Sequence, residues 1–158
     1  MEPRILFLEE KKLIGQSIKM SLVNNQTGLL WGQFAHRIKE IYNRISEDKI
    51  SMQIYPSDYF KHFNPNTEFE KWATVEVPDF EDIPSGLKSF ILEGGLYAVF
   101  DYKGSSSDTS IFHYIFSEWI PDSIYKVDDR PHFEVLGSKY KNNDPDSEEE
   151  IWLPIRGV

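Results

Sequence analysis

Hydrophobic residues recur along the chain in two patterns, one typical of helices and the other of strands. Apolar residues spaced by three or four positions predict a first helix that Thr27 caps after the turn-like pair Asn24-Asn25. A second helix is predicted to begin within residues 108–110 and to end at Pro121, because a proline interrupts helical hydrogen bonding. The apolar stripes are Leu30, Phe34, Ile38, Ile41 and Ile45 in the first helix, and Ile111, Phe112, Ile115, Phe116 and Trp119 in the second.

Segments rich in β-branched and aromatic residues, bounded by Pro, Gly, Asn and Asp, predict the strands. Gly94-Gly95 is predicted to break the fourth of these segments at a turn or bulge. The predicted strands are Leu13–Ser21, Ser51–Phe60, Phe69–Val77, Leu87–Lys103, His132–Tyr140 and Glu149–Arg156.

The two halves of the sequence match at an offset of about 81 residues. The matched elements are Gly15–Lys19 with Leu96–Phe100, the two helices, Pro56–Tyr59 with Gly137–Tyr140, and Trp72 with Trp152. Identities are few, and the near-constant offset carries the match. We therefore expect one domain over residues 1–158, with repeat 1 at about 1–80 and repeat 2 at about 81–158. The predicted class is α+β: two strand–helix–strand–strand modules related by a pseudo-twofold axis, with an antiparallel sheet and both helices on one side.

Charge and composition exclude several classes of function. The net charge is −9, and the Lys and Arg residues are scattered, so we expect no direct nucleic-acid partner. The chain has no cysteine, which excludes disulfides and thiolate chemistry. Its four histidines lack metal-ligand spacing, so we expect no metal and no cofactor. Aromatic residues make up 15% of the chain, which fits a core or a pocket for flat ligands.

The sequence also bears on location. Its start, MEPRILFLEEKK, is unlike a signal peptide, and no stretch approaches the roughly 18 apolar residues that a membrane helix needs. We expect a cytoplasmic protein without a membrane partner.

Four motifs in order resemble those of the GyrI-like small-molecule-binding domains, also called bacterial transcription-activator effector-binding domains. The motifs are GLYAVF at residues 95–100, IFSEWIPDS at 115–123, RPHFE at 130–134 and EEIWLPI at 149–155. The resemblance covers the C-terminal half directly, and the repeat extends it to nearly the whole chain.

The resemblance implies a concave sheet with a central pocket for bulky aromatic, often cationic compounds, and a carboxylate counter-ion that matches Glu134. It also implies a link to transcription regulation, because multidrug-responsive regulators carry this domain beside a DNA-binding domain. Since the repeat begins almost at Met1, the sequence leaves no room for a helix-turn-helix, so we expect a stand-alone domain.

Neighbours of Glu134 on the same strand decide which way its carboxylate points. Successive side chains alternate between the two faces of a strand, so Glu134 and Leu136 face away from Phe133 and Val135. If the helices cover Phe133 and Val135, the carboxylate faces the pocket. Without the resemblance, a lone glutamate on a strand belongs on the solvent face.

The repeat supplies the other candidate pocket residues. Gln53 corresponds to Glu134 and Tyr55 to Leu136, with Met52 and Ile54 expected to face the helices. The alternative is an exposed amide and a half-buried tyrosine. Trp72 and Trp152 are candidates for stacking on a cationic ring, with Trp72 preferred, unless both are core residues.

Three functions follow from these residues and the resemblance. The first is a multidrug-binding protein, a sensor or sequestering protein for aromatic cationic xenobiotics, with Glu134, Leu136, Gln53, Tyr55, Trp72 and Trp152 as ligand-binding residues. The second is a hydrolase of strained, cyclopropane-bearing genotoxins that uses Glu134 as its catalytic residue. The third is an interaction protein that protects an enzyme such as DNA gyrase. The protein partners that these functions imply are DNA gyrase or a transcription factor.

Overall fold

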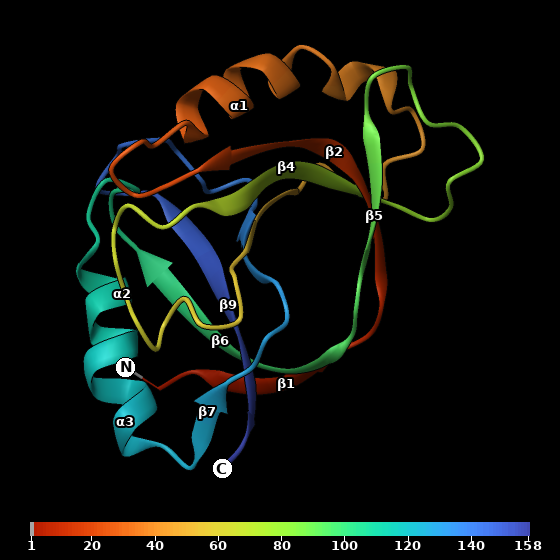
Figure 1. Ribbon diagram of the computed structural model, residues 1–158. Coiled ribbons are helices and arrows are strands. Elements are labelled where there is room, and N and C mark those ends of the chain that lie inside the picture. Colours follow the sequence, from red (N-terminus) through yellow and green to blue (C-terminus); the bar gives the residue numbers. More distant parts are fainter. Residues whose placement is uncertain (1) are drawn as a thin grey trace.

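The computed structural model describes residues 2–158 as an antiparallel sheet with helices packed on it (Figure 1). The strands are β1 (Arg4–Leu8), β2 (Lys11–Met20), β3 (Lys49–Ile54), β4 (Phe69–Val77), β5 (Lys88–Leu92), β6 (Gly95–Lys103), β7 (Tyr125–Val127), β8 (His132–Leu136) and β9 (Glu148–Gly157). The helical segments are α1 (Thr27–Ala35), η1 (Ile38–Glu40), α2 (Ser110–Tyr114), η2 (Ile115–Trp119) and α3 (Ile120–Asp122).

The strand order of the sheet is symmetric about its centre. It runs β1-β6-β9-β8-β3-β4-β2-β5, with β7 added beside β9. The equivalent strands β1 and β5, β6 and β2, β9 and β4, and β8 and β3 therefore lie at the same distance from the centre, where β3 pairs with β8. Met52 lies opposite Phe133 in that pairing. The duplicated α+β fold predicted from the sequence is confirmed.

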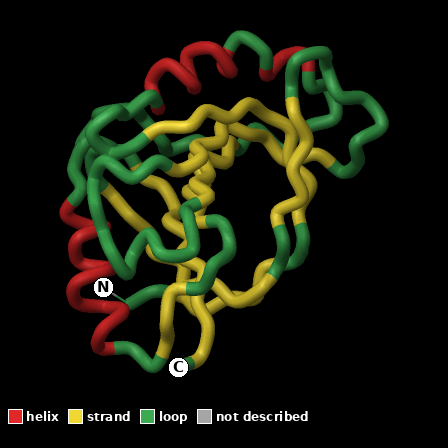
Figure 2. Tube along the Cα trace, viewed as in Figure 1, coloured by secondary structure: helices red, strands yellow, loops and turns green. Residues whose placement is uncertain are grey.

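The outermost strands are exchanged between the halves. β1 pairs with β6 of the second half, and β5 pairs with β2 of the first. The register is continuous, because Leu8 lies opposite Gly95 and Lys11 opposite Leu92. Residues 4–15 and 88–99 thus form one two-stranded ribbon, here called the exchanged ribbon. Figures 1 and 2 show that it closes one side of the curled sheet. Where its two strands pass each other, a Cβ on Gly94 would lie 2.4 Å from the carbonyl oxygen of Leu8.

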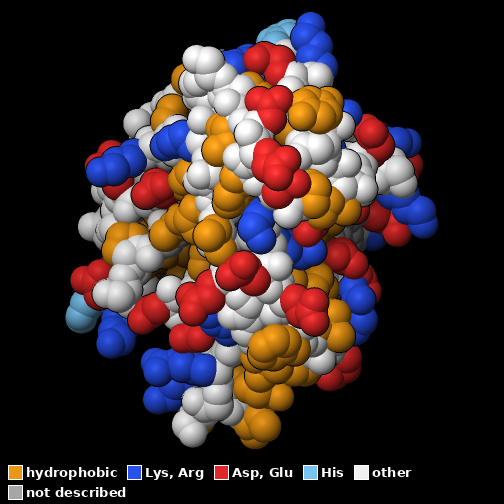
Figure 3. All heavy atoms as spheres, turned by 90° about the vertical axis from the view of Figure 1, so that its right-hand side faces the viewer, with side chains coloured by type: hydrophobic (Ala, Val, Ile, Leu, Met, Phe, Trp, Pro, Cys, Tyr) orange, Lys and Arg blue, Asp and Glu red, His pale blue; other side chains and the backbone are white. Residues whose placement is uncertain are grey.

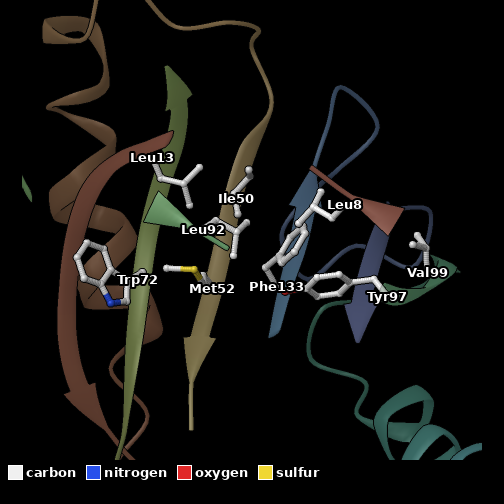
Figure 4. Packing of buried hydrophobic residues seen from close by; sticks show 9 residues of the cluster. All are labelled: Leu8, Leu13, Ile50, Met52, Trp72, Leu92, Tyr97, Val99 and Phe133. Atoms are coloured by element: carbon white, nitrogen blue, oxygen red, sulfur yellow. The ribbon is translucent and has the colours of Figure 1, made fainter. Parts of the chain in front are cut away.

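The two faces of the sheet bury different hydrophobic clusters. Leu30 and Phe34 of α1 pack on Ile14, Ala73 and Val75, while α2 and η2 pack on the equivalent surface of the second half. Both helices therefore cover the outer face of the curled sheet. The inner face buries Leu8, Leu13, Ile50, Met52, Trp72, Leu92, Tyr97, Val99 and Phe133 (Figure 4).

The first helix is shorter than its apolar stripe predicts. α1 ends at Ala35, and a single 3-10 turn follows. Arg44 donates from Nη1 to the carbonyl oxygens of Ile38 and Ile41, at 2.7 and 2.9 Å, which stabilises the chain where it leaves the helix. The N-cap is Gln26, and Thr27, the predicted cap, is the first residue of the helix.

Other boundaries also differ from prediction. The second helix widens into a π turn at η2 and runs through Pro121 to Asp122. β3 ends before Pro56, which has no N–H for a ladder, and β8 ends before Gly137. β1 and β7 were not predicted; β7 has only three residues, too few to show an alternation. Within residues 2–158, none of the helices combines the length and the apolar character needed to cross a membrane.

Candidate functional site

Polar side chains gather on the helix-bearing face where the two halves meet. Residues directly opposite in an antiparallel pair project to the same face. Ser51 lies opposite both Ala73 and Glu134, and Glu134 lies opposite Ile151. Ala73 and Ile151 pack under α1 and α2 respectively, so Glu134 belongs to the helix-bearing face. Trp31 of α1 confirms this, since its Nε1 donates to Ser51 Oγ at 3.4 Å.

The centre of this site is the pair formed by Gln53 and Glu134. The amide Nε2 of Gln53 donates to Oε1 of Glu134 at 3.2 Å. Burial raises the pKa of Glu134, while Lys71 and the Gln53 hydrogen bond act to lower it. The carboxylate is thus stabilised by one amide and one neighbouring cation, in a position where its ionised form is costly.

Lys71 is the cation of the site, and it is buried. It stands on β4, directly opposite Gln53 of β3, and 7% of its surface is exposed. Burial lowers the pKa of its ammonium, and Glu134 and Glu149 act in the opposite direction.

Glu149 is the second carboxylate of the site. It stands on β9, two residues before Ile151, and so faces the same way. Burial, then the charge of Glu134, raises the pKa of Glu149 to about 7, against a lowering effect of Lys71. The side chains of Lys71, Glu134 and Glu149, here called the charged cluster, combine two acids with one base. With both acids ionised and Lys71 protonated, their summed charge is negative.

An aromatic wall adjoins the charged cluster. Phe60, from the loop after β3, stacks on Phe116 of η2 with ring centroids 4.8 Å apart, and on His132 at 5.4 Å. Tyr55 meets His132 edge to face at 4.9 Å. Burial, followed by the charge of Arg130, lowers the pKa of His132 to about 3, so the imidazole is neutral at physiological pH. The wall joins residues of both halves.

The predicted site residues divide between the two faces. Glu134, Gln53 and Tyr55 lie together, and Leu136 continues the same face at the end of β8. Trp72 and Trp152 do not join them, because both pack in the inner cluster with Phe133 and Met52. The expectation that Met52 and Ile54 face the helices is wrong, because both contact the inner cluster. Phe133 and Val135 also contact the inner cluster, so the condition set for Glu134 is not met, and Glu134 lies on the helix-bearing face instead of the inner one.

Several members of the site were missed from sequence. Lys71 was not predicted as a site residue, whereas it is a buried part of the site. Glu149 begins the motif at residues 149–155 but was not singled out for the site. Lys71 could have been found only from the pairing of β3 with β4, in which it lies opposite the predicted site residue Gln53. Phe116 and His132 lie in the motifs at residues 115–123 and 130–134 but were not singled out for the site, nor were Ser51, Trp31 and Phe60.

Two cavities open on the surface, one away from the charged cluster and one beside it. One, of about 150 Å³, lies between α1 and the end of β5, beside Gln16, Ser17 and Lys88. The other, of about 430 Å³, lies at the ends of β6, β8 and β9 and includes Glu149 in its lining. Within residues 2–158, no group of three or more His, Cys, Asp and Glu could hold a metal ion.

The surface of the exchanged ribbon differs from the charged cluster in the kinds of side chain that it presents. Figure 3 shows acidic, basic and apolar side chains intermixed on it. Phe7 of β1 and Ile91 of β5 are exposed in this ribbon. Because acidic and basic side chains alternate on this face between groups of apolar ones, it offers no single chemistry, and we assign the candidate site to the charged cluster.

Comparison with known proteins places these features in a family. Residues 1–156 match the GyrI-like small molecule binding domain. Over 157 residues, the chain is 26% identical to the transcriptional regulator BrlR of Pseudomonas aeruginosa; the match covers 98% of this chain and 56% of the regulator. The chain thus spans little more than half the length of that relative.

Solved structures share the fold at low identity. SAV2435 bound to tetraphenylphosphonium has a TM-score of 0.74 at 17% identity, and the match covers 99% of this chain and 95% of that one. The C-terminal domain of EcmrR has a TM-score of 0.69 at 12% identity, covering 99% and 98%. A hydrolase from Listeria innocua has a TM-score of 0.63 at 13% identity, covering 98% and 92%.

Proposed function

This chain belongs to the family of GyrI-like small molecule binding domains, and from that premise we propose that it binds bulky aromatic cations beside Glu134. The observation that carries this proposal is the charged cluster: two carboxylates against one ammonium, next to an aromatic wall. A cationic ligand compensates the excess negative charge, and its rings stack on the wall.

The surroundings of the site support the same ligand class. The protein carries a net charge of −9, which attracts cations over a range of about 10 Å at ordinary ionic strength. A protein of the same fold has been solved with tetraphenylphosphonium, an aromatic cation. Stacking and apolar burial depend only loosely on ligand shape, so broad multidrug specificity follows.

The biological role that fits is that of a sensor or sequestering protein. Similarity to a transcriptional regulator supports sensing linked to transcription, with this domain as the part that recognises the effector. A protein partner, such as a transcription factor or DNA gyrase, would then read the ligand-bound state.

A second candidate function is hydrolysis, and one observation favours it. A general base works best with a pKa near the working pH, and the pKa of Glu149 is about 7. A hydrolase also shares the fold. In this alternative, Glu149 or Glu134 would activate water against a strained electrophilic substrate.

Titration calorimetry tests the binding function. Tetraphenylphosphonium should bind in the micromolar range, and the neutral triphenylphosphine oxide should bind distinctly more weakly. Absence of heat with both compounds, together with unchanged tryptophan emission, would remove the proposal. Time-dependent loss of a reactive substrate would instead support hydrolysis.

A further inference from the structure

Lys71 is a buried cation that the fold leaves without a direct partner. It exposes 7% of its surface. Within the described part of the chain, it forms no ion pair and no hydrogen bond from its ammonium. Its Nζ is not among the fully buried atoms that lack a hydrogen-bond partner, so the ammonium lies at the edge of the buried region, where a ligand can reach it. A cation on so buried a side chain is costly without a counter-ion, so this position calls for an explanation.

The strand order explains why Glu134 does not pair directly with Lys71. β3 lies between β4 and β8, so the backbones that carry Lys71 and Glu134 are two strand spacings apart, roughly 10 Å. Gln53 stands between them: it lies opposite Lys71 on one side and donates to Glu134 on the other. The site thus presents a positive and a negative point separated by a neutral amide.

We propose that Lys71 binds an anionic group of the ligand, so that the site favours aromatic zwitterions over simple aromatic cations. This inference rests on the proposed function and specifies its ligand class. The cationic part of the ligand lies toward Glu134 and Glu149, and its carboxylate pairs with the ammonium of Lys71. An aromatic framework spans the separation, which a compact amino-acid zwitterion does not.

A simple aromatic cation meets a different environment. It still gains from the two carboxylates, but it leaves the ammonium of Lys71 buried beside a like charge. Lys71 therefore acts as a resident competitor against cations that carry no anionic group.

A matched pair of dyes tests this specificity. Rhodamine B carries a carboxylate on an aromatic cation, and rhodamine B ethyl ester lacks the free carboxylate. The wild-type protein should bind rhodamine B at least about tenfold more tightly by fluorescence anisotropy, as expected for a charge-assisted pair. In Lys71→Met, which keeps the apolar stem, rhodamine B should lose about tenfold and the ester should gain.

Controls separate the possible outcomes. Lys19→Met, at an exposed position on the neighbouring strand β2, should keep the wild-type preference. Lys71→Gln repeats the test with a second neutral side chain if the Met variant does not fold by circular dichroism. Equal affinities for the two dyes in the wild type, or an unchanged preference in the Lys71 variants, would overturn the role of Lys71. Failure of both dyes to bind the wild type would instead overturn the proposed function.

Discussion

Gln53 and Glu134 occupy equivalent positions in the two halves, 81 residues apart, and their side chains are joined by a 3.2 Å hydrogen bond. They flank the pseudo-twofold axis, which passes through the pair Met52 and Phe133. At this place a symmetric protein would present the same side chain twice. Here one half supplies a carboxylate and the other supplies the amide that donates to it, so the site has one charge at its centre.

Glu134→Gln should separate charge from shape. The amide keeps the size of the side chain, and tetraphenylphosphonium should lose about ten- to hundredfold in affinity, or roughly 1–3 kcal/mol. A neutral ligand should change little, because it gains nothing from the carboxylate, and the free energy of unfolding should hold or rise slightly. Calorimetry and urea unfolding measure both quantities. Glu148→Gln, exposed on β9, is the matched control. Equal losses for the cation and the neutral ligand would mean that Glu134 only shapes the site.

Binding of aromatic cations should tighten between pH 6 and pH 8. Glu149, with a pKa of about 7, loses its proton over this range and adds one negative charge to the site. The titratable groups near it are Lys71, Glu134, Tyr102 and Tyr140. Lys71 acts to lower the pKa of Glu149, but burial and the charge of Glu134 outweigh that effect. Calorimetry at three pH values measures the trend, and in Glu149→Gln the affinity should be flat.

Glu149 also makes the free energy of unfolding depend on pH: stability should fall as the pH rises, whereas cation binding should tighten. Because the pKa of Glu149 is raised in the folded state, folding is favoured while the group is protonated. This contribution is fully present below about pH 4.5 and is lost as the pH rises through about 7. Urea unfolding of the wild type should show this loss relative to Glu149→Gln. Parallel pH profiles of the two proteins would exclude Glu149 as its source.

Ligand binding should quench the fluorescence of Trp31. The sequence favoured Trp72 as the residue that stacks on the ligand, but Trp72 lies on the inner face, whereas Trp31 donates to Ser51 within the site. Trp31→Phe should therefore remove most of the change in emission on titration with an aromatic cation. Trp72→Phe should leave it largely intact, and the reverse result would place the ligand on the inner face.

Phe60→Ala should weaken binding of aromatic cations by about fivefold, since a stacked aromatic pair contributes roughly 1 kcal/mol. Phe60 links the loop after β3 to Phe116 and His132, so its loss opens the aromatic wall. Phe63→Ala is the control on the same loop, since Phe63 is more exposed and contacts Tyr59. Similar losses in both variants would point to the order of the whole loop instead of stacking.

Gly94→Ala should destabilise the fold by roughly 1–3 kcal/mol, because its Cβ would collide with backbone of the crossing strand. Gly28→Ala in α1 is the matched control: nothing lies within 4 Å of its Cβ, and alanine favours the helix. Chemical denaturation of both variants measures the difference. An unchanged midpoint for Gly94→Ala would mean that the crossing adapts easily.

The duplication was readable from sequence, but the orientation of the sheet was not. Alternation correctly separates Glu134 from Phe133, since it depends only on the strand. It does not say which face the helices cover, and both faces of this sheet bury apolar residues. The equivalence of Trp72 and Trp152 is confirmed in the inner cluster. Each donates its indole N–H to the glutamate two residues earlier, Glu70 or Glu150.

The site itself was predicted only in part. Glu134, Gln53 and Tyr55 came from the resemblance and the repeat, and they lie together. Lys71 and Glu149 were missed because their burial depends on the register of β4 and β9 against the central strands. Such long-range pairing has no local pattern in the sequence.

The exchange of the outermost strands gives a single chain two strand-swapped halves that are joined covalently. Neither half carries its own edge, so each is completed only by its neighbour. In two separate chains, that completion would depend on protein concentration. The tether replaces this with a fixed effective concentration, in the millimolar range for short connections. A site built where the halves meet therefore survives dilution, and the ligand never has to compete with dissociation.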